Sequence, residues 1–199
     1  MPRWERGSEE RLKQAALELF EERGFENTSV VEIAERARVT TRTFFRYFSD
    51  KREVLFADSA ALQSSLVQAI REAPGVAEPL RVVVAALSGF DWAGLGRDRQ
   101  RRRRAVIAAS PELLERDLVK TDALTDALAE ILEERGVAAD TARLATRVGA
   151  QVFQVAYQDW LASDDGPTLP SRAENALSLL GSLIAPALLS LPPKDGVVT

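Results

Sequence analysis

Four side chains in the segment 41–46 have the chemistry to recognise nucleic-acid bases: Thr41, Arg42, Phe45 and Arg46. Arginine grips the O6 and N7 atoms of guanine with two hydrogen bonds, and threonine contacts a thymine methyl group or a phosphate. On a helix, this spacing makes the four side chains project away from a shared anchoring face. The segment therefore predicts a helix that reads bases in a groove of DNA.

The opposite face of this helix must hold it against the protein. Phe44 and Phe48 are four residues apart, so they share one side of the helix and are predicted to be its buried anchors. Tyr47 and Lys51 lie at the flank and suit contacts to phosphates, which position a helix without reading sequence. An exposed amphipathic helix in an ordinary bundle is the alternative interpretation of the charge pattern alone.

The elements that position the reading helix form a helix-turn-helix. Apolar periodicity and caps predict three helices, over residues 8–23, 29–37 and 41–48. Ser8 is the expected cap of the first helix, and Ser29 with Glu32 forms a capping box at the second. Residues 38–40 make the turn, and Thr40 caps the reading helix.

The rest of the chain has helical patterns and no alternation of period two, so the predicted fold is all-α. Six further helices are expected, over residues 49–73, 78–90, 97–109, 111–135, 140–162 and 171–191, with Asp140 capping the helix at 140–162. The predicted organisation is a helix-turn-helix domain at 1–51, a helical C-terminal domain at 52–191 and a flexible tail at 192–199.

Composition narrows the function. Cysteine and histidine are both absent, which removes thiolate ligands and the commonest general base, so neither a metal site nor a cofactor is expected. The net charge is −4, yet residues 36–52 carry six basic side chains against one acid, whereas residues 1–35 carry five against nine. Positive charge is thus concentrated at the reading helix. No apolar run long enough for a membrane span and no secretory signal is present, so a cytoplasmic protein without membrane partners is expected.

Two stretches, AALELFEERGFENTSVVEIA at 15–34 and VTTRTFFRYFSDK at 39–51, resemble the N-terminal domain of TetR-family transcriptional regulators. The resemblance covers about a quarter of the chain and has many points at fixed spacing. It implies a homodimer on a palindromic operator in double-stranded DNA, with a C-terminal domain that dimerises and binds a small-molecule inducer. It implies contacts to DNA from Ser29, Val30, Val31, Thr40, Thr41, Arg42, Thr43, Phe45, Arg46, Tyr47 and Lys51.

Three positions depart from the family pattern. Arg38 holds the turn position that is often glycine, so a left-handed backbone there carries strain on the order of 1 kcal/mol. Phe45 stands where a phosphate-binding tyrosine is frequent, and it is expected to pack against a thymine methyl group or a sugar. Arg42 replaces a residue that is often small, and it is expected to reach the bases. The operator is therefore not expected to match that of a relative.

The C-terminal domain is expected to supply the dimer interface and the ligand cavity. Apolar residues along two long helices favour a four-helix interface over packing within one subunit: Leu144, Val148, Val152, Val155, Leu177, Leu180, Ile184 and Leu188. Residue type makes six side chains candidates for ligand contact, although core or interface packing is the favoured interpretation of each one alone: Phe90, Trp92, Phe153, Gln154, Tyr157 and Trp160. The arginine run at 97–104 predicts a salt-bridged surface, with recognition of an anion such as an acyl-coenzyme A as the alternative.

The sequence thus predicts a non-enzymatic, ligand-responsive DNA-binding regulator, and a repressor in preference to an activator. Two other functions stay open. A sequence-indifferent DNA-coating protein would bind any duplex with a steep dependence on salt. An enzyme would need paired carboxylates in a pocket, whereas the acids of this chain scatter along helix faces.

Overall fold

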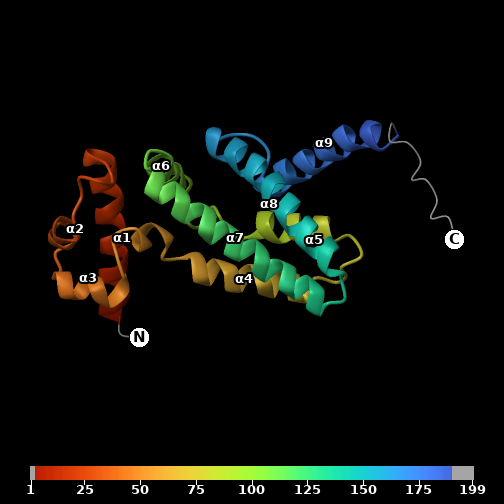
Figure 1. The fold of residues 1–199 in the computed structure, drawn as a ribbon. Helices are drawn as coiled ribbons and strands as arrows, with labels where there is room; N and C mark the ends of the chain where they lie inside the picture. The colour runs from red at the N-terminus through yellow and green to blue at the C-terminus, as the bar shows by residue number, and fades with distance from the viewer. Residues whose placement is uncertain (1–2, 190–199) are drawn as a thin grey trace. The chain divides into compact units, whose positions relative to one another are not determined.

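A computed structural model describes the backbone of residues 3–189 and the side chains of residues 7–185. Every regular element in this part of the chain is helical, which confirms the predicted all-α fold (Figure 1). The chain divides into two compact units, one of residues 1–69 and 91–128 and the other of residues 70–90 and 129–199. The predicted tail at 192–199 lies outside the described residues. None of the helices described is both long and apolar enough to span a bilayer.

The first unit contains the helix-turn-helix. Its elements are α1 (Arg3–Arg23), α2 (Val30–Arg36), α3 (Thr41–Tyr47), a 3₁₀ turn η1 (Glu53–Phe56), most of α4 (Ser59–Glu72), α6 (Arg97–Ala108) and the first part of α7 (Pro111–Glu134). α1 contacts α2, α3, η1 and α6. The long first helix thus braces both short helices and the segment that follows them.

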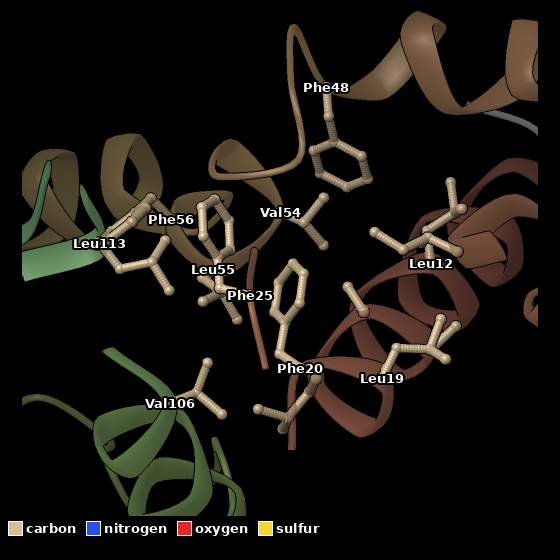
Figure 2. Packing of buried hydrophobic residues seen from close by; sticks show 14 of the residues in the cluster. Leu12, Leu19, Phe20, Phe25, Phe48, Val54, Leu55, Phe56, Val106 and Leu113 are labelled. Carbon is tan, nitrogen blue, oxygen red and sulfur yellow. The ribbon is translucent and has the colours of Figure 1, made fainter. Parts of the chain in front are cut away.

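The core of the first unit explains why these elements pack together. Leu12, Leu19 and Phe20 of α1 are almost completely buried, and they share one apolar cluster with Phe44 and Phe48. The cluster extends to side chains from η1, α6 and α7: Val54, Leu55, Phe56, Val106 and Leu113 (Figure 2). Ile107 of α6 also belongs to it. The helix-turn-helix therefore shares its core with elements that come much later in the chain.

The second unit packs α5 (Pro79–Gly89), α8 (Ala139–Ala162) and α9 (Leu169–Leu189) against one another. Gly149 of α8 allows α5 a close approach, because a Cβ at this position would lie 2.7 Å from Cγ1 of Val83. Arg172 closes the connection between α8 and α9 by donating to the carbonyl oxygens of Pro167 and Asp165 and to the carboxylate of Asp159. These contacts fix α8 and α9 as a helical hairpin.

Two predicted caps and the start of one helix are wrong, and α9 begins at Leu169, two residues before its predicted start. α1 begins at Arg3, so Ser8 lies inside the helix, where it accepts a hydrogen bond from Arg11 instead of capping. α8 begins at Ala139, which places Asp140 in its first turn, paired with Arg143. The helix predicted from residue 49 is replaced by η1, and α4 begins only at Ser59. The three consecutive residues 54–56 of η1 are all buried. Three consecutive residues of an α-helix point to more than one face, so a surface α-helix could not bury all of them.

Candidate nucleic-acid interface

The start of α2 is fixed by the predicted capping box. The Ser29 hydroxyl accepts the amide of Glu32 at 3.2 Å, and the Glu32 carboxylate accepts the amide of Ser29 at 2.9 Å. The hydrogen bonds from the Ser29 amide and hydroxyl, followed by the charge of Arg23, hold the pKa of Glu32 below its ordinary value. Ser29 and Val31 are exposed and Val30 is half-buried. The first turn of α2 therefore presents a rigid surface to solvent.

The turn between α2 and α3 uses a left-handed residue that is not glycine. Arg38 has a φ of 55°, the conformation considered above for this position. The amides of Arg38 and Val39 donate to carbonyl oxygens at the end of α2, at 3.0 and 2.9 Å. Arg11 of α1 donates to the carbonyl oxygen of Ala37 at 3.1 Å. These hydrogen bonds hold the strained turn and fix the direction in which α3 begins.

α3 is anchored by the face that the residue spacing predicts. Phe44 is completely buried and Phe48 nearly so, with ring centroids 5.4 Å apart. Thr40 caps the helix as predicted, because its hydroxyl accepts the amide of Thr43 at 3.1 Å. The two threonine hydroxyls also share a hydrogen bond of 3.0 Å. The helix is therefore fixed both at its start and along its inner face.

The outer face of α3 carries the predicted base-reading residues. Arg42, Phe45 and Arg46 are exposed, and Thr41 is half-buried. Phe45 is 58% exposed, which is unusual for a phenylalanine, and its ring packs edge-on against that of Phe44. A hollow in this surface is lined by Arg42, Thr43, Phe45 and Arg46. An exposed apolar ring between two arginines suits a surface that meets thymine methyl groups and guanine edges.

Tyr47 restrains one of the two exposed arginines. The Arg46 guanidinium donates to the Tyr47 hydroxyl at 3.0 Å and also lies over the Tyr47 ring, 4.9 Å from its centroid. A cation above an aromatic face is attracted by the electrons of the ring. Arg46 is therefore oriented before any ligand arrives, which reduces the entropy that it loses on binding.

Lys51, predicted to contact a phosphate at the start of a helix, lies instead in the turn before η1. Its ammonium donates to the carbonyl oxygens of Phe25 at 2.8 Å and Thr28 at 3.1 Å, and it lies 4.1 Å from the centre of the Phe25 ring. The structure thus gives Lys51 acceptors inside the protein, in the loop that precedes α2.

Ion pairs along α1 modify the charge pattern of the sequence. Arg36 was counted with the reading helix, yet its guanidinium binds the carboxylates of Glu22 at 2.8 Å and Glu18 at 3.5 Å. The hydrogen bond to Glu22 raises the pKa of Arg36, and the same bond lowers that of Glu22. Positive charge on the reading surface therefore comes from Arg42 and Arg46, while Arg36 compensates the acidic first helix.

The arginine run at 97–104 also turns toward the first helix. Arg102 binds the carboxylate of Glu21 at 2.8 Å, and Arg99 pairs with Glu10. Arg103 donates to the carbonyl oxygen of Leu55 in η1 at 2.7 Å. The run is salt-bridged, as predicted, but these three arginines join α6 to α1 and η1 within the first unit.

The segment between α3 and α4 is held by further charges. Asp50 accepts the amides of Arg52 and Glu53 and the guanidinium of Arg52, and the last of these contacts contributes most to lowering the pKa of Asp50. Glu53 in turn accepts hydrogen bonds from Arg116 at 2.6 Å and Lys120 at 3.1 Å, both on α7. η1 is therefore clamped to α7 directly after the reading helix.

The residues predicted to contact a ligand lie in different environments. Phe153, Tyr157 and Trp160 are buried in the second unit and stack in sequence along α8, with centroids 5.3 and 5.7 Å apart. Gln154 on α8 and Phe90 at the end of α5 are half-buried. Trp92 is also half-buried and belongs to the first unit. The three stacked rings are the part of the predicted set that the fold brings together.

The residues predicted for dimerisation fall into two groups. Leu144, Val155 and Ile184 are large apolar side chains that are 66%, 57% and 42% exposed. Val148, Leu177 and Leu180 are half-buried, Val152 is buried within its own unit, and the side chain of Leu188 lies outside the described residues. Leu179 and Leu183 of α9 are also exposed, at 58% and 66%, although the helical pattern did not single them out. α8 and α9 thus carry exposed apolar side chains along much of their length.

Known proteins resemble both the N-terminal segment and the chain as a whole. The sequence profile described as bacterial regulatory proteins, tetR family, matches residues 12–57. The transcriptional regulator TcmR of Streptomyces glaucescens is 31% identical over 204 aligned residues, covering 95% of this chain and 84% of TcmR. The transcriptional activator FasR of Mycolicibacterium smegmatis is 30% identical, covering 82% of this chain and 76% of FasR.

Solved structures share the fold at lower sequence identity. NalD, a repressor of a multidrug efflux pump in Pseudomonas aeruginosa, aligns with a TM-score of 0.61 and 19% identity, covering 89% of this chain and 96% of NalD. FadR of Bacillus subtilis, solved in complex with stearoyl-CoA, aligns with a TM-score of 0.54 and 21% identity, covering 85% of this chain and 96% of FadR. These alignments show that the chain shares its fold with both proteins.

Proposed function

Because the chain belongs to the tetR family of bacterial regulatory proteins and is a DNA-binding transcriptional regulator, we propose that it represses transcription as a homodimer on a palindromic operator. A small-molecule inducer then releases it. The observation that carries this proposal is the outer face of α3, where two arginines and an exposed phenylalanine surround a hollow on a helix held by buried rings. Such a helix fits the major groove.

The proposed contacts divide into two kinds. Thr41, Arg42, Phe45 and Arg46 are assigned to base edges, because arginine reads guanine, and threonine or an apolar ring meets the thymine methyl group. Phosphate and sugar contacts that fix the register of the helix are assigned to the rest of the surface: Ser29, Val30, Val31, Thr40, Thr43 and Tyr47. The capping hydrogen bonds of Ser29 and Thr40 support these assignments by keeping both helix starts rigid.

The proposed homodimer rests on the apolar surface of α8 and α9. Leu144, Val155, Leu179, Leu183 and Ile184 are all more than two-fifths exposed. A monomer seldom leaves so many large aliphatic side chains on one pair of helices, and two copies of the hairpin would bury them in a four-helix arrangement. A twofold axis through this surface makes the two α3 helices equivalent, which a palindrome requires.

The proposed inducer is a molecule with a large apolar part. Phe153, Tyr157 and Trp160 offer a stacked aromatic wall inside the second unit, and apolar walls are typical of ligand pockets. The complex of FadR with stearoyl-CoA supports a ligand of this kind. An inducer shifts the population of conformations only as far as it binds one of them better. We propose that the effect of the inducer reaches the DNA-binding helices through η1, because Glu53 of η1 accepts hydrogen bonds from Arg116 and Lys120 of α7.

Selection of bound duplexes from a random-sequence pool, at physiological salt, tests this function. A recovered palindrome with half-sites about 34–36 Å apart is the expected result. Recovery of every sequence equally would instead indicate a DNA-coating protein, with affinity that falls steeply as salt rises. A reporter gene placed behind the recovered site then tests the sign of regulation. Lower expression in the presence of the protein supports repression, and higher expression contradicts it.

A further inference from the structure

The ammonium of Lys51 is occupied by one loop of the same chain. Its Nζ atom lies 2.8 Å from the carbonyl oxygen of Phe25, 3.1 Å from that of Thr28 and 3.5 Å from that of Glu26. An ammonium carries three donors and no acceptor, so these carbonyl groups account for its hydrogen-bonding capacity. The Phe25 ring, 4.1 Å away, adds a favourable cation–π contact.

The loop that Lys51 binds leads directly into α2. Gly24 ends α1 with a φ of 81°, and the Thr28 hydroxyl donates to the carbonyl oxygen of Gly24 at 2.9 Å, which closes the loop. Ser29, the next residue, caps α2, and Val30 and Val31 form its first turn. The carbonyl groups of Phe25 and Thr28 therefore belong to the loop directly before α2, and Lys51 binds them from 26 and 23 residues away along the chain.

Lys51 is itself fixed to the segment that follows it. Asp50 accepts the amides of Arg52 and Glu53 at 2.8 and 3.2 Å, which holds the turn before η1. Lys51 lies between these residues, so its side chain connects the turn before η1 with the loop before α2.

We propose that Lys51 is a positioning residue of the DNA-binding surface, which holds the start of α2 through the carbonyl groups of residues 25–28 and does not bind a phosphate. This role rests on the proposed function, because it matters only if α2 and α3 contact DNA. The compact ammonium of Lys51 reaches these carbonyl groups from a single nitrogen atom, whereas arginine spreads its donors over a larger planar fork and does not reproduce that geometry. An arginine at this position would therefore keep the positive charge of Lys51 without keeping its contacts to the carbonyl groups.

The test compares Lys51→Met, Lys51→Arg and the control Arg46→Met. Affinity for a duplex recovered by selection is measured from about 50 to 200 mM salt, the range over which phosphate contacts dominate the salt effect. Amide hydrogen exchange of residues 28–31 is measured on the protein without DNA. Arg46 lies on the reading face, outside the loop, so Arg46→Met removes a charge from the surface without changing the carbonyl contacts.

Positioning predicts the same defect in both Lys51 variants. Amides 28–31 should exchange about tenfold faster than in the native protein, and duplex affinity should fall by about tenfold or more, because hydrogen bonds to a charged group are lost. The slope of log K against log salt should stay close to its native value. Arg46→Met should leave exchange at 28–31 unchanged.

A phosphate contact predicts a different result. Lys51→Met would then reduce the salt slope by about two for a dimer, since each lost phosphate contact contributes about 0.9, and Lys51→Arg would retain affinity. Native exchange rates in Lys51→Met, or native affinity in Lys51→Arg, would overturn the positioning role. If the native protein itself binds no selected duplex, the proposed function fails, and the exchange measurement still decides whether Lys51 holds the loop.

Discussion

Arg38 holds a φ of 55° without the conformational freedom of glycine. A left-handed conformation costs a residue with a Cβ roughly 1–2 kcal/mol. Glycine avoids this cost, but it loses more conformational entropy on folding, which offsets part of the gain. Arg38→Gly is therefore expected to raise the free energy of unfolding in urea by about 0.5–1 kcal/mol. Gly24→Ala is the matched control, because φ there is 81° and a Cβ would meet no atom within 4 Å. It should destabilise by about 1 kcal/mol. A less stable Arg38→Gly would contradict this account.

Arg42 is the residue whose loss should change sequence preference most directly. Its side chain is exposed on the reading face beside Phe45 and Arg46. Arg42→Ala is expected to relax specificity at one base position per half-site, at a cost of roughly 1–3 kcal/mol for the preferred base. Repeating the duplex selection with the variant measures this change. Equal weakening of all sequences would assign Arg42 to phosphate instead.

Side chains were predictable where their partners are local. Phe44 and Phe48 could be assigned to the core because a spacing of four residues places them on one helix face. The partners of Lys51 and Arg36 could not be predicted, because they lie 26 and 14 residues away and nothing in the local sequence indicates which carbonyl or carboxylate a long basic side chain will reach.

The same distinction holds for whole elements. Ser29 and Thr40 were correctly predicted as caps because each carries its partner three residues further along the chain. Ser8 and Asp140 have the residue type of a cap, but the helices begin before them. The delayed start of α4 follows from packing, since Val54, Leu55 and Phe56 are buried together in the core of the first unit. That core is assembled from distant segments, so the local pattern could not reveal it.

The cap of α2 makes the stability of this element depend on pH. The pKa of Glu32 is lowered in the folded protein from an ordinary value of 4.5, chiefly by the hydrogen bonds from Ser29. A carboxylate with a lowered pKa stabilises the fold above its unfolded pKa and loses that contribution as pH falls through the folded value. Glu32→Gln is therefore expected to be less stable than the native protein at pH 7, with the difference shrinking below pH 4.5. Urea midpoints between pH 7 and 3 measure it. A difference that is constant with pH would exclude the charge of Glu32 as its cause.

At the scale of the whole molecule, assembly depends on α8 and α9. Leu144 is 66% exposed, and a charge at this position would be buried without a partner in the proposed dimer. Leu144→Glu is expected to convert the dimer to a monomer in sedimentation experiments and to weaken operator binding at least tenfold. Leu118→Glu on α7 is the matched control, since Leu118 is 70% exposed and lies outside these two helices. A Leu144→Glu variant that stays dimeric would place the interface elsewhere.

The shared core of the first unit has a consequence for the newborn chain. Val106, Ile107 and Leu113 belong to the cluster that contains Phe20 and Phe56. Until residues 106–113 have been synthesised, the rings of Phe20 and Phe56 lack these packing partners, and exposed apolar surface of this kind favours aggregation. A chain truncated soon after residue 57 should therefore be insoluble. Truncation would then remove the regulator from the cell without leaving behind a DNA-binding piece that no inducer can release.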